Sequence, residues 1–97
     1  MTAYVIAQIS IHDRARYDRY VAGFMPVLKQ YGGRLLVADE GPEAVEGQWG
    51  RDKLIVLAFP DREAALRWSG SPEYRAISVD RVAATEGVVL LADGVGP

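Results

Sequence analysis

Cysteine is absent from this 97-residue chain, and histidine occurs once. Without cysteine there can be no disulfide, no thiolate nucleophile and no thiolate-bound zinc. A single imidazole excludes every site that needs two. The sequence also lacks a glycine-rich phosphate loop and the residue spacings typical of metal sites. We therefore expect neither a metal ion nor a cofactor.

Excess positive charge and long apolar runs are lacking as well. The net charge is −2, which argues against a protein that binds nucleic acid or an anionic membrane through its overall charge. No apolar run approaches the roughly 20 residues of a membrane span. The first residues carry no basic region and meet a charge at Asp13, unlike a secretory signal. We expect a soluble, cytoplasmic domain without nucleic-acid or membrane partners.

The residues that are present indicate one domain over residues 1–97. Apolar residues make up 49% of the chain and charged residues 25%, which is an ordinary globular mixture. Four apolar stretches predict strands, and in the first of them apolar residues occupy every second position. Apolar residues at helical spacing predict three helices. The expected strands are 3–11, 34–39, 53–59 and 86–92, and the expected helices are 14–31, 62–68 and 72–84.

Capping residues separate these elements. Asp13, Asp61 and Ser71 each precede a predicted helix as an N-cap. Gly32-Gly33 predicts a left-handed end to the first helix. Pro26 lies inside that helix and predicts a kink or a restart, because proline lacks a backbone donor and clashes with the preceding turn.

The element order β-α-β-β-α-β predicts a ferredoxin-like α+β protomer. Right-handed crossovers then give a four-stranded antiparallel sheet with helices on one face. Strands 53–59 and 86–92 are apolar on both sides, and the helices cover only one side, so we expect a homodimer that pairs the open sheet faces into a barrel. Alternatively, the turn-rich segment 40–52 or the C-terminal tail covers the open face. Residues 44–49 within that segment are expected to form a short strand extension.

Short motifs are spread along the chain: Tyr17-x-x-Tyr20, Tyr31-Gly32-Gly33-Arg34, Val45-Glu46-Gly47-x-Trp49, Phe59-Pro60-Asp61, Trp68-x-x-Ser71-Pro72-Glu73-Tyr74 and Arg81. Together they resemble a small bacterial family, the domain of unknown function 1330. The resemblance runs from about Tyr4 to Val95 and implies a ferredoxin-like protomer of the dimeric α/β-barrel superfamily, with no assigned reaction. Other families of this fold include cofactor-free monooxygenases, isomerases, lactone-processing enzymes and haem-binding proteins, which is an analogy of fold alone.

Aromatic residues and one arginine are the main candidates for a binding site. Tyr17 and Tyr20 either line an apolar pocket between helix and sheet or pack in the core, and buried phenols need a partner for their hydroxyl groups. Trp68, Tyr74 and Arg81 lie on the later helices. There, Arg81 either clamps a carboxylate of a ligand or pairs with an acid of the chain, Glu73 or Glu46.

Two further residues are candidates for proton transfer. Glu46 lies near Trp49, where an apolar neighbour could raise the pKa of the carboxyl group. The alternative is a hairpin or bulge in which Gly47 meets a backbone requirement. His12 is either a general base oriented by Asp13 or an exposed residue before a helix.

Three functions remain open. The protein binds a small apolar or carboxylated molecule between helices and sheet, it is a cofactor-free isomerase or monooxygenase acting there, or it is an interaction module whose role is dimerisation. The candidate ligand-binding residues are Tyr17, Tyr20, Trp68, Tyr74, Arg81 and Glu46.

Overall fold

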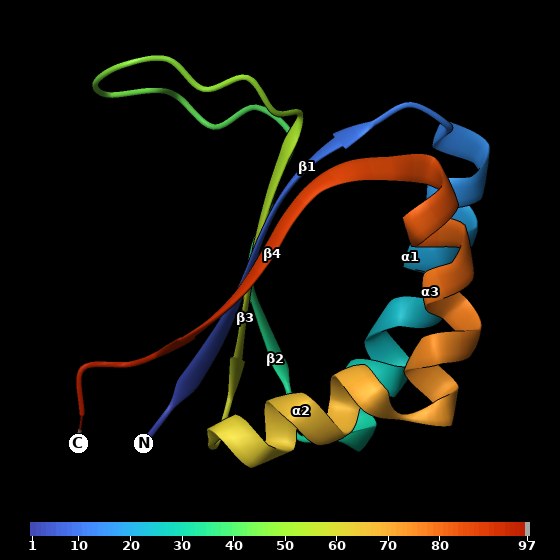
Figure 1. The fold of residues 1–97 in the computed structure, drawn as a ribbon, viewed down its shortest axis with the longest axis vertical. Helices are drawn as coiled ribbons and strands as arrows, with labels where there is room; N and C mark the ends of the chain where they lie inside the picture. Colours follow the sequence, from blue (N-terminus) through green and yellow to red (C-terminus); the bar gives the residue numbers. More distant parts are fainter. Residues whose placement is uncertain (97) are drawn as a thin grey trace.

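The computed structural model describes residues 1–96, and Pro97, the end of the expected tail, lies outside them. These residues form one sheet layer and one helix layer (Figure 1), the predicted α+β ferredoxin-like fold. The elements, in chain order, are β1 (Ala3–Ile11), α1 (Arg14–Gln30), β2 (Arg34–Asp39), β3 (Lys53–Phe59), α2 (Arg62–Gly70), α3 (Pro72–Ala84) and β4 (Thr85–Asp93).

The four strands form one antiparallel sheet in the order β2-β3-β1-β4. Alternation along β1 buries Val5 and Ile9 against the helices, and the register places Leu57 of β3 on the same side as Val5. We call this side of the sheet the inner face and the opposite side the outer face. The register of β2 shifts between Leu35 and Val37, which is the signature of a bulge.

The outer face is apolar in its centre. A row of one residue from each strand crosses it, because Val37 pairs with Val56, Val56 with Ile6, and Ile6 with Leu90. We call these four residues the central row. Val37 and Leu90 at its ends are exposed, so no segment of residues 1–96 covers the row completely.

Local capping explains where the helices begin, as the sequence predicted. The side chains of Asp13, Asp61 and Ser71 each accept a hydrogen bond from the backbone N–H three residues further on, at 3.2, 2.8 and 3.0 Å. These bonds satisfy donors that the first turn of a helix leaves free.

The end of α1 is confirmed, and the predicted restart at Pro26 is wrong. Gly32 adopts φ 78°, and the Gly33 N–H donates to the Leu28 carbonyl at 3.0 Å, as in a left-handed helix end. Residues 14–30 form one helix through Pro26. The carbonyl that loses its donor belongs to Ala22, an exposed residue, so water can replace the missing hydrogen bond.

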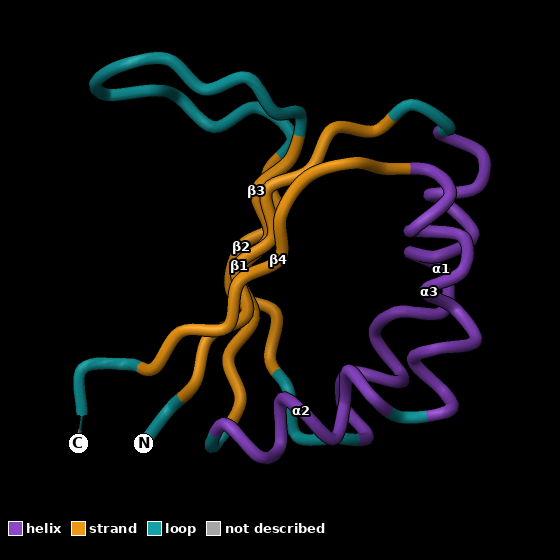
Figure 2. The backbone as a smooth tube through the Cα atoms, in the orientation of Figure 1, coloured by secondary structure: helices purple, strands orange, loops and turns teal. Residues whose placement is uncertain are grey.

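The segment between β2 and β3, residues 40–52, projects from the sheet on the side away from the helices (Figure 2). We call this segment the arm. The predicted strand extension at 44–49 is absent, because the arm consists of bends and coil with no neighbouring strand to pair with. Trp49 anchors the arm by donating from Nε1 to Oε1 of Gln8 at 3.1 Å. Val45 at the tip is 89% exposed, so the tip does not cover the outer face.

The cap at Ser71 gives a first testable prediction. Ser71 is buried, and its Oγ also donates to the Trp68 carbonyl at 2.8 Å. Ser71→Ala should lower the free energy of unfolding by about 1–2 kcal/mol through loss of the cap. Ser69→Ala is the control, because the Ser69 hydroxyl is exposed and bonds only the carbonyl of Leu66. Equal denaturant midpoints for the two variants would contradict the role of Ser71.

Candidate functional site

A cavity of about 140 Å³ lies between the inner face of the sheet and the helix layer. Its floor is formed by apolar residues of the inner face, such as Val5, Ile55 and Leu57. The helix α1 packs mainly against α3, and in Figure 2 the two helices stand apart from the middle of the sheet while α2 approaches one end of it. The cavity is therefore bordered by side chains of all three helices and of the inner face.

Five of the six residues predicted for a binding site line this cavity: Tyr17, Tyr20, Trp68, Tyr74 and Arg81. The three helices contribute them, two residues from α1, one from α2 and two from α3. Their aromatic rings pack edge to face or tilted, with centroids 6.1 Å apart for Tyr20 and Tyr74 and 4.2 Å apart for Trp68 and Tyr74. These packing geometries are favourable for aromatic pairs and stabilise the helical side of the cavity wall.

Tyr20, Tyr74 and Arg81 form a chain of hydrogen bonds. The two phenol oxygens are 2.9 Å apart, and Nε of Arg81 donates to the Tyr74 oxygen at 3.2 Å. The bond between the phenols uses one hydroxyl proton, whichever of them donates it. The other hydroxyl proton has no acceptor within residues 1–96, so the chain offers a spare donor.

Within this series of hydrogen bonds, the buried phenol of Tyr20 stays neutral. Desolvation, followed by the neighbouring Tyr74, raises the pKa of the Tyr20 hydroxyl far above its ordinary value. Burial disfavours the charged phenolate. Tyr20 therefore keeps its proton at neutral pH and stays a hydrogen-bond donor rather than a base.

Arg81 makes no ion pair with any acid of residues 1–96. Glu73, one predicted partner, instead accepts a hydrogen bond from the Tyr31 hydroxyl at 2.7 Å. That bond raises the pKa of the Tyr31 hydroxyl. Apart from the bond to Tyr74, the guanidinium group of Arg81 keeps its donors free at the cavity.

Trp68 adds another unused donor. The side chain is 3% exposed and lines the cavity, yet its indole N–H has no acceptor in the described part of the chain. Buried donors without acceptors are uncommon in folded proteins because they lose their hydrogen bond to water. Taken with Arg81 and the phenol chain, the wall of the cavity has more donors than acceptors.

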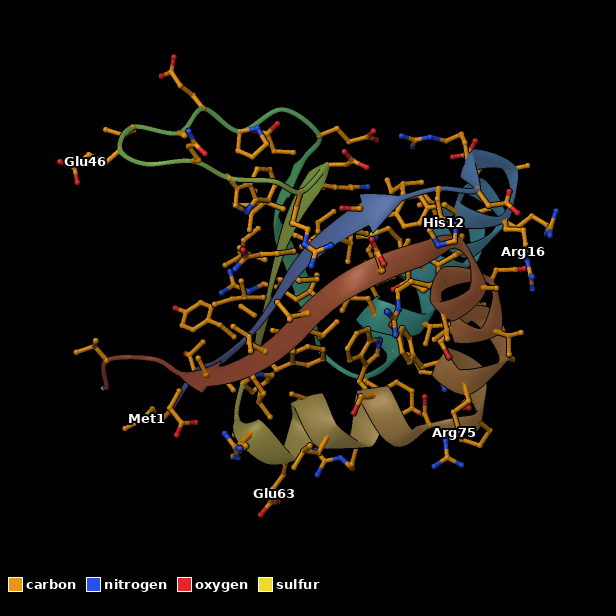
Figure 3. All side chains as sticks on the ribbon, turned by 45° about the horizontal axis from the view of Figure 1, so that its top comes forward. Met1, His12, Arg16, Glu46, Glu63 and Arg75 are labelled. Atoms are coloured by element: carbon orange, nitrogen blue, oxygen red, sulfur yellow. The ribbon has the colours of Figure 1, made fainter. Side chains whose placement is uncertain are left out.

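The two candidates for proton transfer lie outside the cavity. Glu46 is at the tip of the arm and points away from the sheet, and His12 is at the turn from β1 to α1 (Figure 3). Both side chains are exposed. Gly47 beside Glu46 adopts φ 76°, so the backbone requirement of a tight turn accounts for that glycine.

Lys53 also lines the cavity, and it was not among the predicted site residues. It is the first residue of β3 and pairs with Ile9, which places it on the inner face. Its Nζ lies 4.9 Å from the centroid of the Tyr17 ring. The alternation along β3 could have identified Lys53, because it lies at every second position with Ile55 and Leu57 and therefore shares their face of the sheet.

Within residues 1–96, no helix is both long enough and apolar enough to cross a membrane.

Solved structures share this fold across nearly the whole chain. A protein of unknown function from Rhodopseudomonas palustris is 16% identical, with 99% of this chain and 84% of that chain covered and a TM-score of 0.82. A dimeric ferredoxin-like protein of unknown function from Jannaschia sp. CCS1 is also 16% identical, with 97% and 100% covered and a TM-score of 0.67. SnoaB, a cofactor-independent oxygenase from Streptomyces nogalater, is 11% identical, with 99% and 95% covered and a TM-score of 0.68.

At these identities the structures show the fold and nothing about chemistry. A search of curated proteins found no match. The sequence model of a protein family described as Domain of unknown function (DUF1330) matches residues 2–95. The chain belongs to this family.

Proposed function

We propose that the protein binds a small molecule with an apolar body and an anionic group in the cavity beneath α1. The observation that carries this proposal is Arg81, a guanidinium group at an apolar cavity that forms no ion pair with any acid of residues 1–96. A cation in such a place is costly unless an anion accompanies it. The fork of the guanidinium group suits a carboxylate, which can accept two of its hydrogen bonds at once.

The surplus of donors supports the same class of ligand. One hydroxyl proton of the Tyr20–Tyr74 pair and the indole N–H of Trp68 have no acceptor among residues 1–96. A ligand that brings several acceptor oxygens would pair with donors that the protein leaves free. The aromatic rings and the apolar floor of the cavity would hold its apolar body.

Binding is favoured over catalysis by the residues that line the cavity. Among those of residues 1–96 there is no carboxylate and no imidazole, so the cavity lacks the two side chains that most often act as a general base near neutral pH. SnoaB, which shares this fold, is described as a cofactor-independent oxygenase. Catalysis without a cofactor is therefore the alternative function. A packed interior would favour a pure interaction module, and the cavity argues against that role.

We also propose that two copies pair through the outer faces of their sheets. The central row is apolar and its ends are exposed, whereas an antiparallel sheet with a solvated face normally carries polar residues there. Neither the arm nor residues 94–96 cover the row completely, because Val37 and Leu90 are exposed. The similar structure from Jannaschia sp. CCS1 is described as dimeric, which agrees with this pairing.

Arg81→Met tests the binding proposal, with benzoate as the probe. We expect benzoate to bind the unmodified protein better than benzamide, its uncharged counterpart, in an NMR titration. The substitution should weaken benzoate about 10-fold to 100-fold, because it removes a charged hydrogen-bonding partner. It should lower the free energy of unfolding by only about 1 kcal/mol, since it breaks one bond to Tyr74 and leaves no acid unpaired.

Arg75→Met is the matched control. Arg75 belongs to the same helix, and its side chain points outward from α3 (Figure 3). The control should bind benzoate as the unmodified protein does. Unchanged binding in the Arg81 variant, or equal affinity for benzoate and benzamide, would overturn the proposal.

A further inference from the structure

Lys53 gives the cavity that Arg81 lines a second positive charge. A series of contacts through three phenols connects the two cations. Nζ of Lys53 lies over the ring of Tyr17, Tyr17 packs on Tyr20 with centroids 5.8 Å apart, and Tyr20 leads through Tyr74 to Arg81. Two cations that form no ion pair with residues 1–96 therefore line one cavity, and a single carboxylate balances only one of the two charges.

No acid of the chain balances Lys53 within residues 1–96. It takes part in no ion pair and no hydrogen bond there. The acid that senses its charge is Glu40, at the end of β2. Both carboxylate oxygens of Glu40 are engaged by Arg14, whose hydrogen bond is the main cause that lowers the pKa of Glu40, with a smaller contribution from Lys53.

The position of Lys53 is unusual for a lysine. Its side chain belongs to the inner face, where its neighbours on β1 and β3 are apolar, and it is only partly exposed. The contact with the face of the Tyr17 ring stabilises the ammonium group. That contact leaves its three N–H donors free for a ligand. The Tyr17 hydroxyl likewise makes no hydrogen bond with residues 1–96 and lies at the same end of the cavity.

We propose that Lys53 is a specificity residue and that the ligand carries two acidic groups on a flat apolar body, one held by Arg81 and the other by Lys53. This inference rests on the proposed binding function and names its ligand class. The row of aromatic rings between the cations would pack along the body of the ligand. A molecule with one acidic group would bind at Arg81 and leave Lys53 unpaired.

Aromatic acids that differ in one charge test this inference. Terephthalate and isophthalate carry two carboxylates, and in 4-carbamoylbenzoate and 3-carbamoylbenzoate one of the two is replaced by an uncharged amide of similar size. We expect the better of the two dicarboxylates to bind at least about 10-fold more tightly than its carbamoyl counterpart. Lys53→Met should abolish that advantage while the affinity for the carbamoyl compound stays unchanged.

The chain contains one other lysine, Lys29, which is exposed at the end of α1 and serves as the control. Lys29→Met removes the same charge and should leave the advantage of the dicarboxylate intact. In the unmodified protein, the dicarboxylate should slow acetylation of Lys53 by acetic anhydride, with Lys29 as the internal reference in mass spectrometry. This second measurement does not depend on how well the variant folds.

The outcomes separate the two proposals. If the dicarboxylates bind no better than the carbamoyl compounds, or if Lys53→Met keeps the advantage, Lys53 is not a specificity residue. The proposed binding function then stands, provided that benzoate still depends on Arg81. If none of these aromatic acids binds at millimolar concentration, both proposals fall together.

Discussion

Leu90→Lys is expected to halve the mass of the protein in solution. The unmodified protein should scatter light at micromolar concentration as a particle of twice 10.6 kDa, because two outer faces pair. Leu90 ends the central row and is 50% exposed in one copy. A lysine there would place an unpaired charge in an apolar interface, at a cost of several kcal/mol in each copy, and the particle should become a single chain.

Leu66→Lys is the control for this change. Leu66 is a leucine of α2 with a similar exposed fraction, 55%, and it belongs to the helix layer rather than to the outer face. The Leu66 variant should keep the mass of the pair. A single-chain mass for the unmodified protein, or two-chain particles for the Leu90 variant, would refute pairing through the central row.

Gly87→Ala is expected to be the most destabilising single change in the sheet. Gly87 lies in β4 opposite Ile9 and adopts φ 148°, a conformation that side chains rarely tolerate. An added Cβ would also collide with the backbone carbonyl oxygen of Gln8 in β1. Backbone cannot move aside as a flexible side chain can, so we expect a loss of about 3–5 kcal/mol from strain and overpacking together.

Gly70→Ala provides the comparison. Gly70 ends α2, its φ is negative, and a Cβ there would meet nothing within 4 Å. Alanine favours a helix more than glycine does by up to about 1 kcal/mol, so this variant should be as stable as the unmodified protein or slightly more so. Urea denaturation measures both variants. A Gly87 variant as stable as the Gly70 variant would mean that β4 can shift its register against β1.

The fold was largely predictable because its signals are local. The caps at Asp13, Asp61 and Ser71 depend on residues three apart, and the strands follow from short apolar runs. The predicted restart at Pro26 was wrong because the cost of a proline in a helix depends on whether water reaches the carbonyl that loses its hydrogen bond. The sequence alone does not show that the Ala22 carbonyl is exposed. The strand predicted at 44–49 was also wrong. A strand needs a neighbouring strand to pair with, and only the folded sheet shows whether one is present.

The site was predictable in its aromatic residues and not in its charges. Helical spacing and polar side-chain tips were enough to select Tyr17, Tyr20, Trp68, Tyr74 and Arg81, although their distances were not available from the sequence. Lys53 was missed because a lysine before an apolar run is typically the solvated end of a strand. Glu46 was included on its proximity to Trp49 in the sequence, and the arm separates it from the cavity.

The cavity between α1 and the sheet also bears on how the protein responds to pressure. A void inside a folded chain vanishes when the chain unfolds and water fills the space, so compression shifts the equilibrium toward the unfolded state. The cavity lies between the layers and is partly open, so compression acts there through the part that water does not fill. A molecule seated in the cavity would fill that part and make the folded chain less compressible.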